Sequence, residues 1–468
     1  MRNVQSLGTH GRGDAGSGVE FFRRRLYNGI RRELRRRRSV RRGGCMGMLT
    51  DDAAVVLLPP DREEDVRRRT KKKRAARIAA AVTMPIVILT VFFAVMLNVR
   101  SLGVGEGSTN GAYDTVLADI DGITRANPRI IDIAMLGAHD ANSFSVDADS
   151  PIDHKTGGDL LKAVYPVSSG FQYRMSVTQT VSPYALLMQG ARMLHMKYTY
   201  YDGMWYATHS LLGRPFREDV LDVLRYLAQH PGEVVILFLQ CTYFGETQSL
   251  DTFHDWLADV RLDGKSIYDY VNYGEVNVYG SEFDDGVRIE QLTYNDVTRS
   301  GASAGVVLMD RREYPAVIEG DTAESAYSAY FFDIDSNSSQ EWHNRMGSGV
   351  LVGEIDRYAL ELNASGLYRW KLRVNQTQAA VSGESFGDVM RSIGAWSLLK
   401  FAEKHNIALL ENDNFDAWLK AMPVFQVDFA NSSYGDFKRR VNEKIRARNE
   451  YIVSVLSEEG STYEDLYR

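Results

Sequence analysis

Short apolar runs alternate with amphipathic stretches between residues 114 and 435. The apolar runs are rich in branched and aromatic residues, and this composition predicts buried strands. The predicted strands are IIDIAMLG (130–137), ARMLHMKYTYY (191–201), EVVILFLQCTY (233–243), AGVVLMDRR (304–312), SAYFFDID (328–335), YRWKLRVN (368–375), NIALLEN (406–412) and PVFQVDFA (423–430).

The stretches between several of these strands have the spacing of amphipathic helices. In 217–230, apolar residues recur at helical spacing, and Pro231-Gly232 then stops the helix before the next strand. A second helix is predicted over 385–405. The apolar stripe of the first helix consists of Val220, Leu221, Val223, Leu224 and Leu227.

Near-continuous apolar strands separated by helices indicate a parallel sheet covered on both faces. Eight strands over about 320 residues favour a distorted TIM-like (β/α) barrel, incompletely closed, over 114–435. A doubly wound open sheet is the alternative, although no GxGxxG follows the first strand. The charged, helix-prone segment 436–468 is expected to pack outside the barrel as a C-terminal helical extension.

Residues 78–97, IAAAVTMPIVILTVFFAVML, form a run of twenty residues without a charge. A helix of this length covers the roughly 30 Å of bilayer hydrocarbon. The upstream flank, RRRTKKKRAAR, is strongly basic, whereas only Arg100 lies close downstream. The positive-inside rule therefore predicts a single-pass transmembrane helix over 78–99, with a cytoplasmic N-terminus and an extracytoplasmic domain that follows a linker over 100–113.

The charge of the chain is divided by this segment. Residues 1–77 hold 22 Lys and Arg against 9 Asp and Glu, although the whole chain has a formal net charge of −6. We expect a basic cytoplasmic tail over 1–77 that is mostly disordered and attracted to anionic lipid. Nucleic acid is not an expected partner, because no aromatic interleaving accompanies the basic runs. Only Cys45 and Cys241 occur, which excludes a disulfide scaffold.

Polar residues at strand ends are the candidate catalytic groups. His139 and Asp140 follow the first strand, His209 follows an apparent hairpin after the second, and Asp428 lies in the last. In parallel α/β folds, reactive side chains collect beyond the carboxyl ends of the strands. Two histidines backed by two carboxylates are suited to general acid–base cleavage of a phosphodiester. A histidine at a strand end is also commonly a hydrogen-bonded structural residue, so the residue types alone leave both interpretations open.

Five segments, in order, resemble the phosphatidylinositol-specific phospholipase C X-domain superfamily, in its bacterial type. LGAHDANSF is similar to the first catalytic motif, ATHSLLG to the second histidine motif, and VFQVDFAN to the closing strand with its aspartate. The five segments are LGAHDANSF (136–144), QTVSPYALLMQGARMLHMKY (179–198), ATHSLLG (207–213), HPGEVVILFLQ (230–240) and VFQVDFAN (424–431).

The resemblance implies a role for each candidate residue. His139 would be the general base on the inositol 2-hydroxyl, supported by Asp428. His209 would be the general acid that protonates the diacylglycerol oxygen, with Asp140 as its partner. The implied substrate is a phosphatidylinositol-like phospholipid, the products are diacylglycerol and a cyclic inositol phosphate, and the implied fold is a distorted TIM barrel. No cofactor is implied.

One departure changes these expectations. Where the family usually has Asp-x-Arg, this chain has His195-Met196-Lys197. Lys197 would contact the phosphate as a point charge rather than as a planar fork, and Arg192 is a second candidate phosphate ligand. His195, in place of an aspartate, is a further candidate site residue. Lys197 would also repel calcium, which prefers six to eight oxygen ligands, so we expect no metal requirement.

Two other functions stay open beside the phospholipase. The departure at His195 and Lys197 is also compatible with a catalytically silent ectodomain that binds a lipid or glycan head group. A different phosphodiesterase on a similar barrel is the other alternative. Such enzymes commonly show an early His-Arg-Gly string, which this sequence lacks.

Overall fold

The computed structural model describes residues 60–102, 117–153, 159–276, 286–311, 325–343, 345, 347–378 and 396–467. The predicted tail up to residue 59 and most of the predicted linker lie outside these ranges. The chain divides into two units after Thr83, and the second unit, Met84–Arg468, contains the sheet.

Eight parallel strands follow one another around the second unit. Hydrogen bonding joins them in the order β7-β6-β5-β2-β1-β10-β9-β8, and a short antiparallel pair, β3 and β4, extends from β2. Their bounds are β1 Met135–Ala138, β2 Ala191–Tyr201, β3 Met204–His209, β4 Leu211–Pro215, β5 Val234–Tyr243, β6 Gly305–Asp310, β7 Phe331–Asp333, β8 Ser338–Gln340, β9 Leu372–Gln376 and β10 Val424–Val427.

The sheet is a nearly closed barrel. The last strand, β10, pairs in parallel with the first, β1, which returns the sheet to its start. Among the described residues, no ladder joins β7 to β8, which are connected directly by the four-residue helix α9. The predicted distorted, incompletely closed TIM-like barrel is therefore confirmed.

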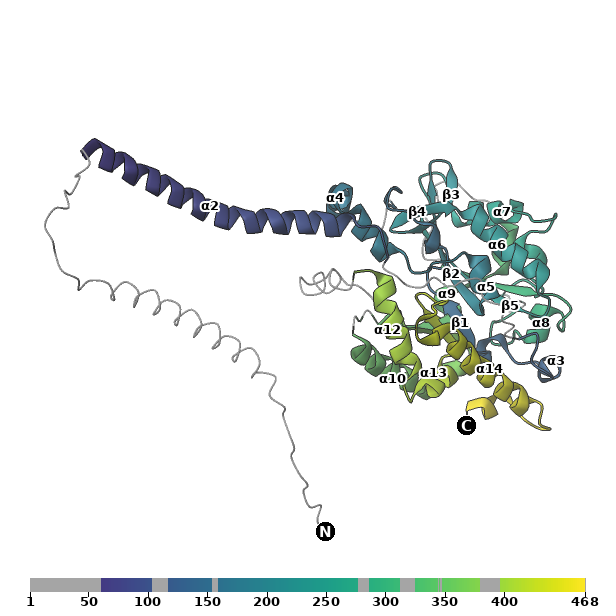
Figure 1. Ribbon diagram of the computed structural model, residues 1–468. Coiled ribbons are helices and arrows are strands. Elements are labelled where there is room, and N and C mark those ends of the chain that lie inside the picture. The colour runs from purple at the N-terminus through teal and green to yellow at the C-terminus, as the bar shows by residue number, and fades with distance from the viewer. Residues whose placement is uncertain are drawn as a thin grey trace, which may run out of the picture. The chain divides into compact units, whose positions relative to one another are not determined.

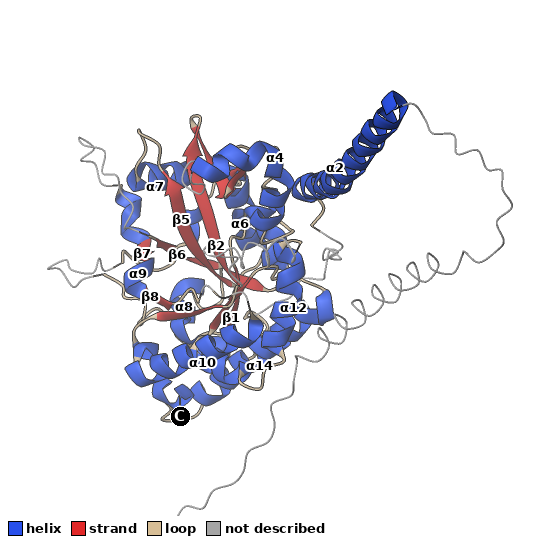
Figure 2. Ribbon diagram, turned by 90° about the vertical axis from the view of Figure 1, so that its left-hand side faces the viewer, coloured by secondary structure: helices blue, strands red, loops and turns tan. Residues whose placement is uncertain are grey.

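Helices surround the strands, as Figure 2 shows, and those named α10, α12, α13 and α14 lie together in Figure 1. Their bounds are α2 Pro60–Asn98, α3 Ile123–Ala126, α4 Asp159–Ser176, α5 Pro183–Met188, α6 Phe216–Gln229, α7 Leu250–Asp259, α8 Tyr294–Thr298, α9 Ile334–Asn337, α10 Ser348–Ser365, α12 Leu398–Leu410, α13 Phe415–Ala421 and α14 Phe437–Leu456. Strands β5 and β6 are almost wholly buried between barrel interior and helices, which explains their continuous apolar sequences.

Helix α6 confirms the predicted stripe. Of its five apolar positions only Leu221 is half-buried, while the other four are buried against the core. The helix ends one residue before His230, and the Gly232 that follows has a φ of 82°, a left-handed conformation that glycine adopts without strain.

One predicted strand was wrong, and one strand was not predicted. Residues 406–410 continue helix α12, because Ala402, Leu409 and Leu410 are buried at helical rather than alternating spacing. Strand β8 was missed, since its sequence Ser-Ser-Gln has no apolar pattern. The predicted strands at 130–137 and 328–335 are shorter than expected, and the first part of the predicted helix 385–405 lies outside the described residues.

Helix α2 contains the apolar segment found in the sequence. Its stretch Arg67–Asn98 is long and apolar enough to cross a membrane, and none of its most apolar window is buried by protein. Large side chains along it, such as Ile78, Ile86 and Val95, are each more than half exposed. A soluble chain rarely exposes so continuous an apolar surface, so this helix is a candidate membrane span.

Candidate active site

Side chains from β1, β2 and β3 or the residues that follow them meet at one buried carboxylate, that of Asp140. His139 and Asp140 follow β1, His195 and Lys197 lie on the neighbouring β2, and His209 ends β3. Asp428 follows β10 on the other side of β1. Because β1, β2 and β10 are parallel neighbours, their side chains collect at the same end of the barrel, and the antiparallel strand β3 returns from β2 to bring His209 to the same place.

Both oxygens of Asp140 have nitrogen neighbours. The residue is fully buried. Its Oδ2 lies 3.3 Å from His139 Nε2, 3.1 Å from His209 Nε2 and 3.1 Å from Lys197 Nζ. Its Oδ1 lies 3.1 Å from His195 Nδ1. The two histidines predicted as base and acid therefore approach one and the same oxygen.

Each of the three imidazoles is held at its other nitrogen. His139 Nδ1 lies 2.8 Å from Asp428 Oδ1. His209 Nδ1 donates to the Ser176 carbonyl at 2.6 Å, and His195 Nε2 lies 3.1 Å from Gln240 Oε1. These partners fix the tautomer and leave His139 Nε2 and His209 Nε2 facing the centre of the site.

The rings themselves are close neighbours. The His139 and His209 rings are 6.1 Å apart between centroids and nearly perpendicular, at 79°. The His139 and His195 rings are 5.3 Å apart and stacked at 26°. Three imidazoles thus share one small volume at the end of the barrel.

Burial and charge oppose one another at this centre. Burial alone would raise the pKa of Asp140, but the positive charges of His139 and Lys197, with those of the other two imidazoles, lower it well below its usual range. Burial lowers the pKa of His195 and of His209, and the attraction of Asp140 offsets only part of that effect. Asp140 is therefore ionised near neutral pH, and an anion bound in the site would draw protons back to the imidazoles.

The backbone turns sharply beside three of the site residues. Asp140 has a φ of 43°, Ser210 a φ of 65° and Phe429 a φ of 52°. Residues other than glycine adopt this left-handed region at a cost of roughly 1–2 kcal/mol each. Such strain concentrates where function requires a side chain to be aimed in one direction. Here the turns aim His139, His209 and Asp428.

Three amide side chains that the sequence interpretation had not singled out hold the site together. Gln179 donates to the His139 carbonyl at 2.9 Å and to the Val427 carbonyl at 3.2 Å, and its Oε1 accepts from the Ala430 amide at 3.0 Å. Asn142 pairs with the backbone of Lys197 through both ends of its amide. Gln240 could have been found by the same signal as His139, a polar residue near the end of an apolar strand.

The structure corrects the expectation for Arg192. This side chain is fully buried and pairs with Glu233, with Nε 2.6 Å from Oε2. It also donates to the carbonyls of Leu187 and Ala191. Its guanidinium is thus held by partners at or before the amino-terminal ends of β2 and β5. Arg192 is a structural cation, and Lys197 is the one of the two candidate phosphate ligands that reaches Asp140.

Part of this cluster has the composition of a metal site. Ligand atoms of His139, Asp140 and His195 all lie within 4.8 Å of one another. Two imidazole nitrogens and a carboxylate oxygen suit zinc or a similar transition metal far better than calcium.

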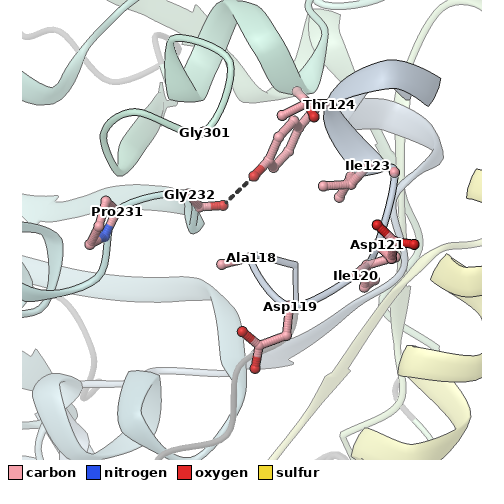
Figure 3. Close-up of a pocket in the computed structure, with 11 residues that line it drawn as sticks. Ala118, Asp119, Ile120, Asp121, Ile123, Thr124, Pro231, Gly232 and Gly301 are labelled. Atoms are coloured by element: carbon pink, nitrogen blue, oxygen red, sulfur yellow. Dashed lines mark hydrogen bonds between the residues drawn. The ribbon is translucent and has the colours of Figure 1, made fainter.

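A separate pocket lies away from this cluster (Figure 3). It is lined by the loop around Asp119 and by Pro231 and Gly232, which precede β5. The Tyr294 hydroxyl donates to the Gly232 carbonyl at 2.8 Å in its wall. The pocket therefore belongs to the amino-terminal end of the strands and contains none of the predicted site residues.

No family model matches the chain, and no curated protein does. The chain is similar to bacterial phosphatidylinositol-specific phospholipases C. The enzyme from Listeria monocytogenes is 15% identical, with a TM-score of 0.45 over 72% of this chain and 98% of that one. A pentafluoro-Phe variant of the Staphylococcus aureus enzyme is 14% identical, with a TM-score of 0.45 over 69% and 99%. L. pealei PLC21 is more distant, at 10% identity and a TM-score of 0.27 over 66% of this chain and 31% of that one.

Proposed function

We propose that the chain is a membrane-anchored phosphodiesterase that cleaves a phosphatidylinositol-like lipid by the acid–base action of two histidines. One observation carries the proposal: His139 Nε2 and His209 Nε2 both approach Asp140 Oδ2, and each ring is fixed at its opposite nitrogen. Two oriented imidazoles on one small site can take a proton from one oxygen of a phosphodiester and give a proton to another.

The proposed reaction is an intramolecular displacement at phosphorus. His139 Nε2 accepts the proton of the inositol 2-hydroxyl while that oxygen bonds to phosphorus. The bond from phosphorus to the diacylglycerol oxygen breaks, and His209 Nε2 donates a proton to this leaving oxygen. The products are a cyclic inositol phosphate and diacylglycerol. Asp428 stabilises the imidazolium that forms on His139, in the way an orienting carboxylate stabilises other catalytic histidines.

Positive charge for the transition state comes from Lys197. Its ammonium lies 3.1 Å from Asp140 and is partly exposed, with 21% of the side chain accessible. A point charge stabilises developing negative charge without dictating the orientation of the phosphate, unlike the planar fork of an arginine. This chain is therefore expected to tolerate a wider range of diester head groups than a site built on arginine.

Helix α2 supplies the proposed anchor. Its exposed apolar surface and its basic upstream flank support a single span with a cytoplasmic N-terminus, which would place the barrel outside the cytoplasm. The basic residues before the span, Arg67 to Arg77, would contact anionic lipid head groups. A lipid substrate would then be supplied by the membrane in which the enzyme is anchored.

The test uses the full chain in mixed micelles that contain phosphatidylinositol, with phosphorus NMR to detect cyclic phosphate. His139→Ala and His209→Ala should each lower the rate by about 10²–10⁴-fold. His230→Ala, outside the cluster, is the matched control and should leave the rate unchanged. If wild type binds the lipid without any turnover, the chain is a head-group binder and the catalytic proposal is wrong.

The same assay tests the expected independence from calcium. Activity should persist in excess chelator, because the central carboxylate is already neutralised by Lys197 and the imidazoles. Loss of activity that added calcium restores would overturn this expectation.

A further inference from the structure

Two buried atoms at the centre of the site lack a hydrogen-bond partner. Within the described part of the chain, Asp140 Oδ1 and His195 Nδ1 form no hydrogen bond, although they lie only 3.1 Å apart. A buried polar group without a partner destabilises the folded protein. The acid–base reaction gives neither atom a role, because it uses Oδ2 of Asp140 and the other two imidazoles.

The partner of His195 explains why the pair is unbonded. Its Nε2 faces Gln240 Oε1, which can only accept, so the proton of the neutral ring lies on Nε2. Nδ1 then carries a lone pair and lies 3.1 Å from Oδ1 of the Asp140 carboxylate. Two acceptors that face each other in a buried site are the arrangement that a cation placed between them would satisfy.

His139 completes a set of three ligands. One ligand atom from each of His139, Asp140 and His195 lies within 4.8 Å of the others. Asp428 holds Nδ1 of His139, so its Nε2 faces Asp140, and Gln240 holds Nε2 of His195, so its Nδ1 faces Asp140. Carboxylate or amide partners behind the imidazoles are the outer contacts that orient histidine ligands in metal sites.

We propose that His139 Nε2, Asp140 Oδ1 and His195 Nδ1 bind a borderline divalent cation of the zinc class, with the fourth position open to water or a phosphate oxygen. Three protein ligands and an open position suit tetrahedral zinc or cobalt. The bound cation takes the lone pair that His139 needs to accept a proton, so it switches off the diesterase reaction. This inhibitory consequence, unlike the binding itself, rests on the proposed function.

Lys197 limits the affinity. Its ammonium lies on Oδ2 of the same carboxylate and repels a cation at Oδ1. Lys197→Met should therefore bind the cation more tightly than wild type. This direction distinguishes a site at Asp140 from binding elsewhere on the acidic surface, where Lys197 would have no effect.

The experiment titrates cobalt into the full chain in detergent micelles, prepared without a histidine tag. Wild type should develop visible d–d absorption that saturates at one equivalent and disappears when zinc is added. Gln240→Ala should weaken binding by about 10–100-fold, as loss of an outer partner does in other histidine sites. His195→Asp and His195→Gln should weaken it at least as much, and His230→Ala should leave it unchanged.

The activity readout is kept separate from the binding readout. In the phosphatidylinositol assay, zinc should inhibit wild type and should fail to inhibit a His195→Asp protein at the same concentration. Circular dichroism of each variant reports whether it is folded, and the Gln240→Ala variant keeps the test valid if both His195 variants unfold. Absence of the cobalt spectrum, or equal binding by the folded variants, would refute the site, whether or not the diesterase is active.

Discussion

Arg192 and Lys197 lie five residues apart on β2, and substitutions at the two positions should have different effects. Arg192 and Glu233 are both fully buried, and their side chains meet at 2.6 Å. Removing one partner of a buried pair leaves an uncompensated charge and costs about 3–5 kcal/mol. Arg192→Met should lower the free energy of unfolding by this amount, toward the lower end, because Glu233 also accepts from the Leu117 and Ala118 amides.

Lys197→Met should have a smaller effect on stability than Arg192→Met and a larger effect on the rate. Its side chain is partly exposed, and its loss removes one charge-assisted hydrogen bond, worth about 1.5–3 kcal/mol. The larger effect should fall on catalysis, since loss of one group that stabilises transition-state charge lowers kcat by about 10²–10³-fold. Arg192→Met should leave kcat/KM of the folded protein unchanged.

Urea unfolding followed by circular dichroism, with the full chain in micelles, measures the stabilities, and the lipid assay measures the rates. A double variant, Arg192→Met with Glu233→Gln, should recover part of the lost stability, because the unpaired charge is then removed as well. The reasoning would be refuted if Arg192→Met had the same urea midpoint of unfolding as wild type and instead had a higher KM. That pattern would indicate that Arg192 contacts the substrate.

Three further predictions concern the histidine cluster. Burial lowers the pKa of His195 and His209, so below about pH 6.5 the unfolded chain binds more protons than the folded chain and the free energy of unfolding should fall. Urea unfolding curves at several pH values check this, and His209→Gln should make the free energy of unfolding depend less on pH. Gln179→Glu keeps its acceptor but loses both donated bonds, so stability should fall by about 1–3 kcal/mol and kcat should fall with it, as unfolding and rate measurements would show. Asp428→Asn should lower kcat by about 10²–10⁴-fold with KM little changed, because the imidazolium of His139 loses its counter-charge; unchanged kcat would contradict the assigned support role.

The barrel could be predicted because its strands carry their own signal. β5 and β6 are buried on both faces, so their sequences are largely apolar and the strands are easily recognised. The prediction of a strand over 406–412 was wrong, because a short apolar run does not show whether its buried positions have strand or helix spacing. Here they have the spacing of a helix. Strand β8 is three polar residues long and carries no signal at all.

The site was predictable at its strand ends and not beyond them. His139 and Asp428 end apolar strands, so their meeting follows from a parallel barrel. The sequence does not reveal which face of a strand a side chain takes near a bulge, and the pairing of β1 with β2 shifts register between Leu136 and Gly137. Arg192 lies in that irregular stretch, which is why its partner could only be seen in three dimensions.

In the proposed mechanism, the lone pair on His139 Nε2 either accepts a proton or binds a cation. The same electrons cannot accept a proton from a hydroxyl and bind a divalent cation, so catalysis and cation binding exclude each other at this atom. An aspartate at position 195 would add negative charge beside Asp140 and favour hard cations with oxygen ligands. The imidazole of His195 adds none, and it offers a nitrogen ligand instead. In the proposed mechanism, a histidine at this position would make the site less suited to calcium, keep it receptive to an anionic phosphate, and expose the proposed base His139 to competition from zinc-class ions.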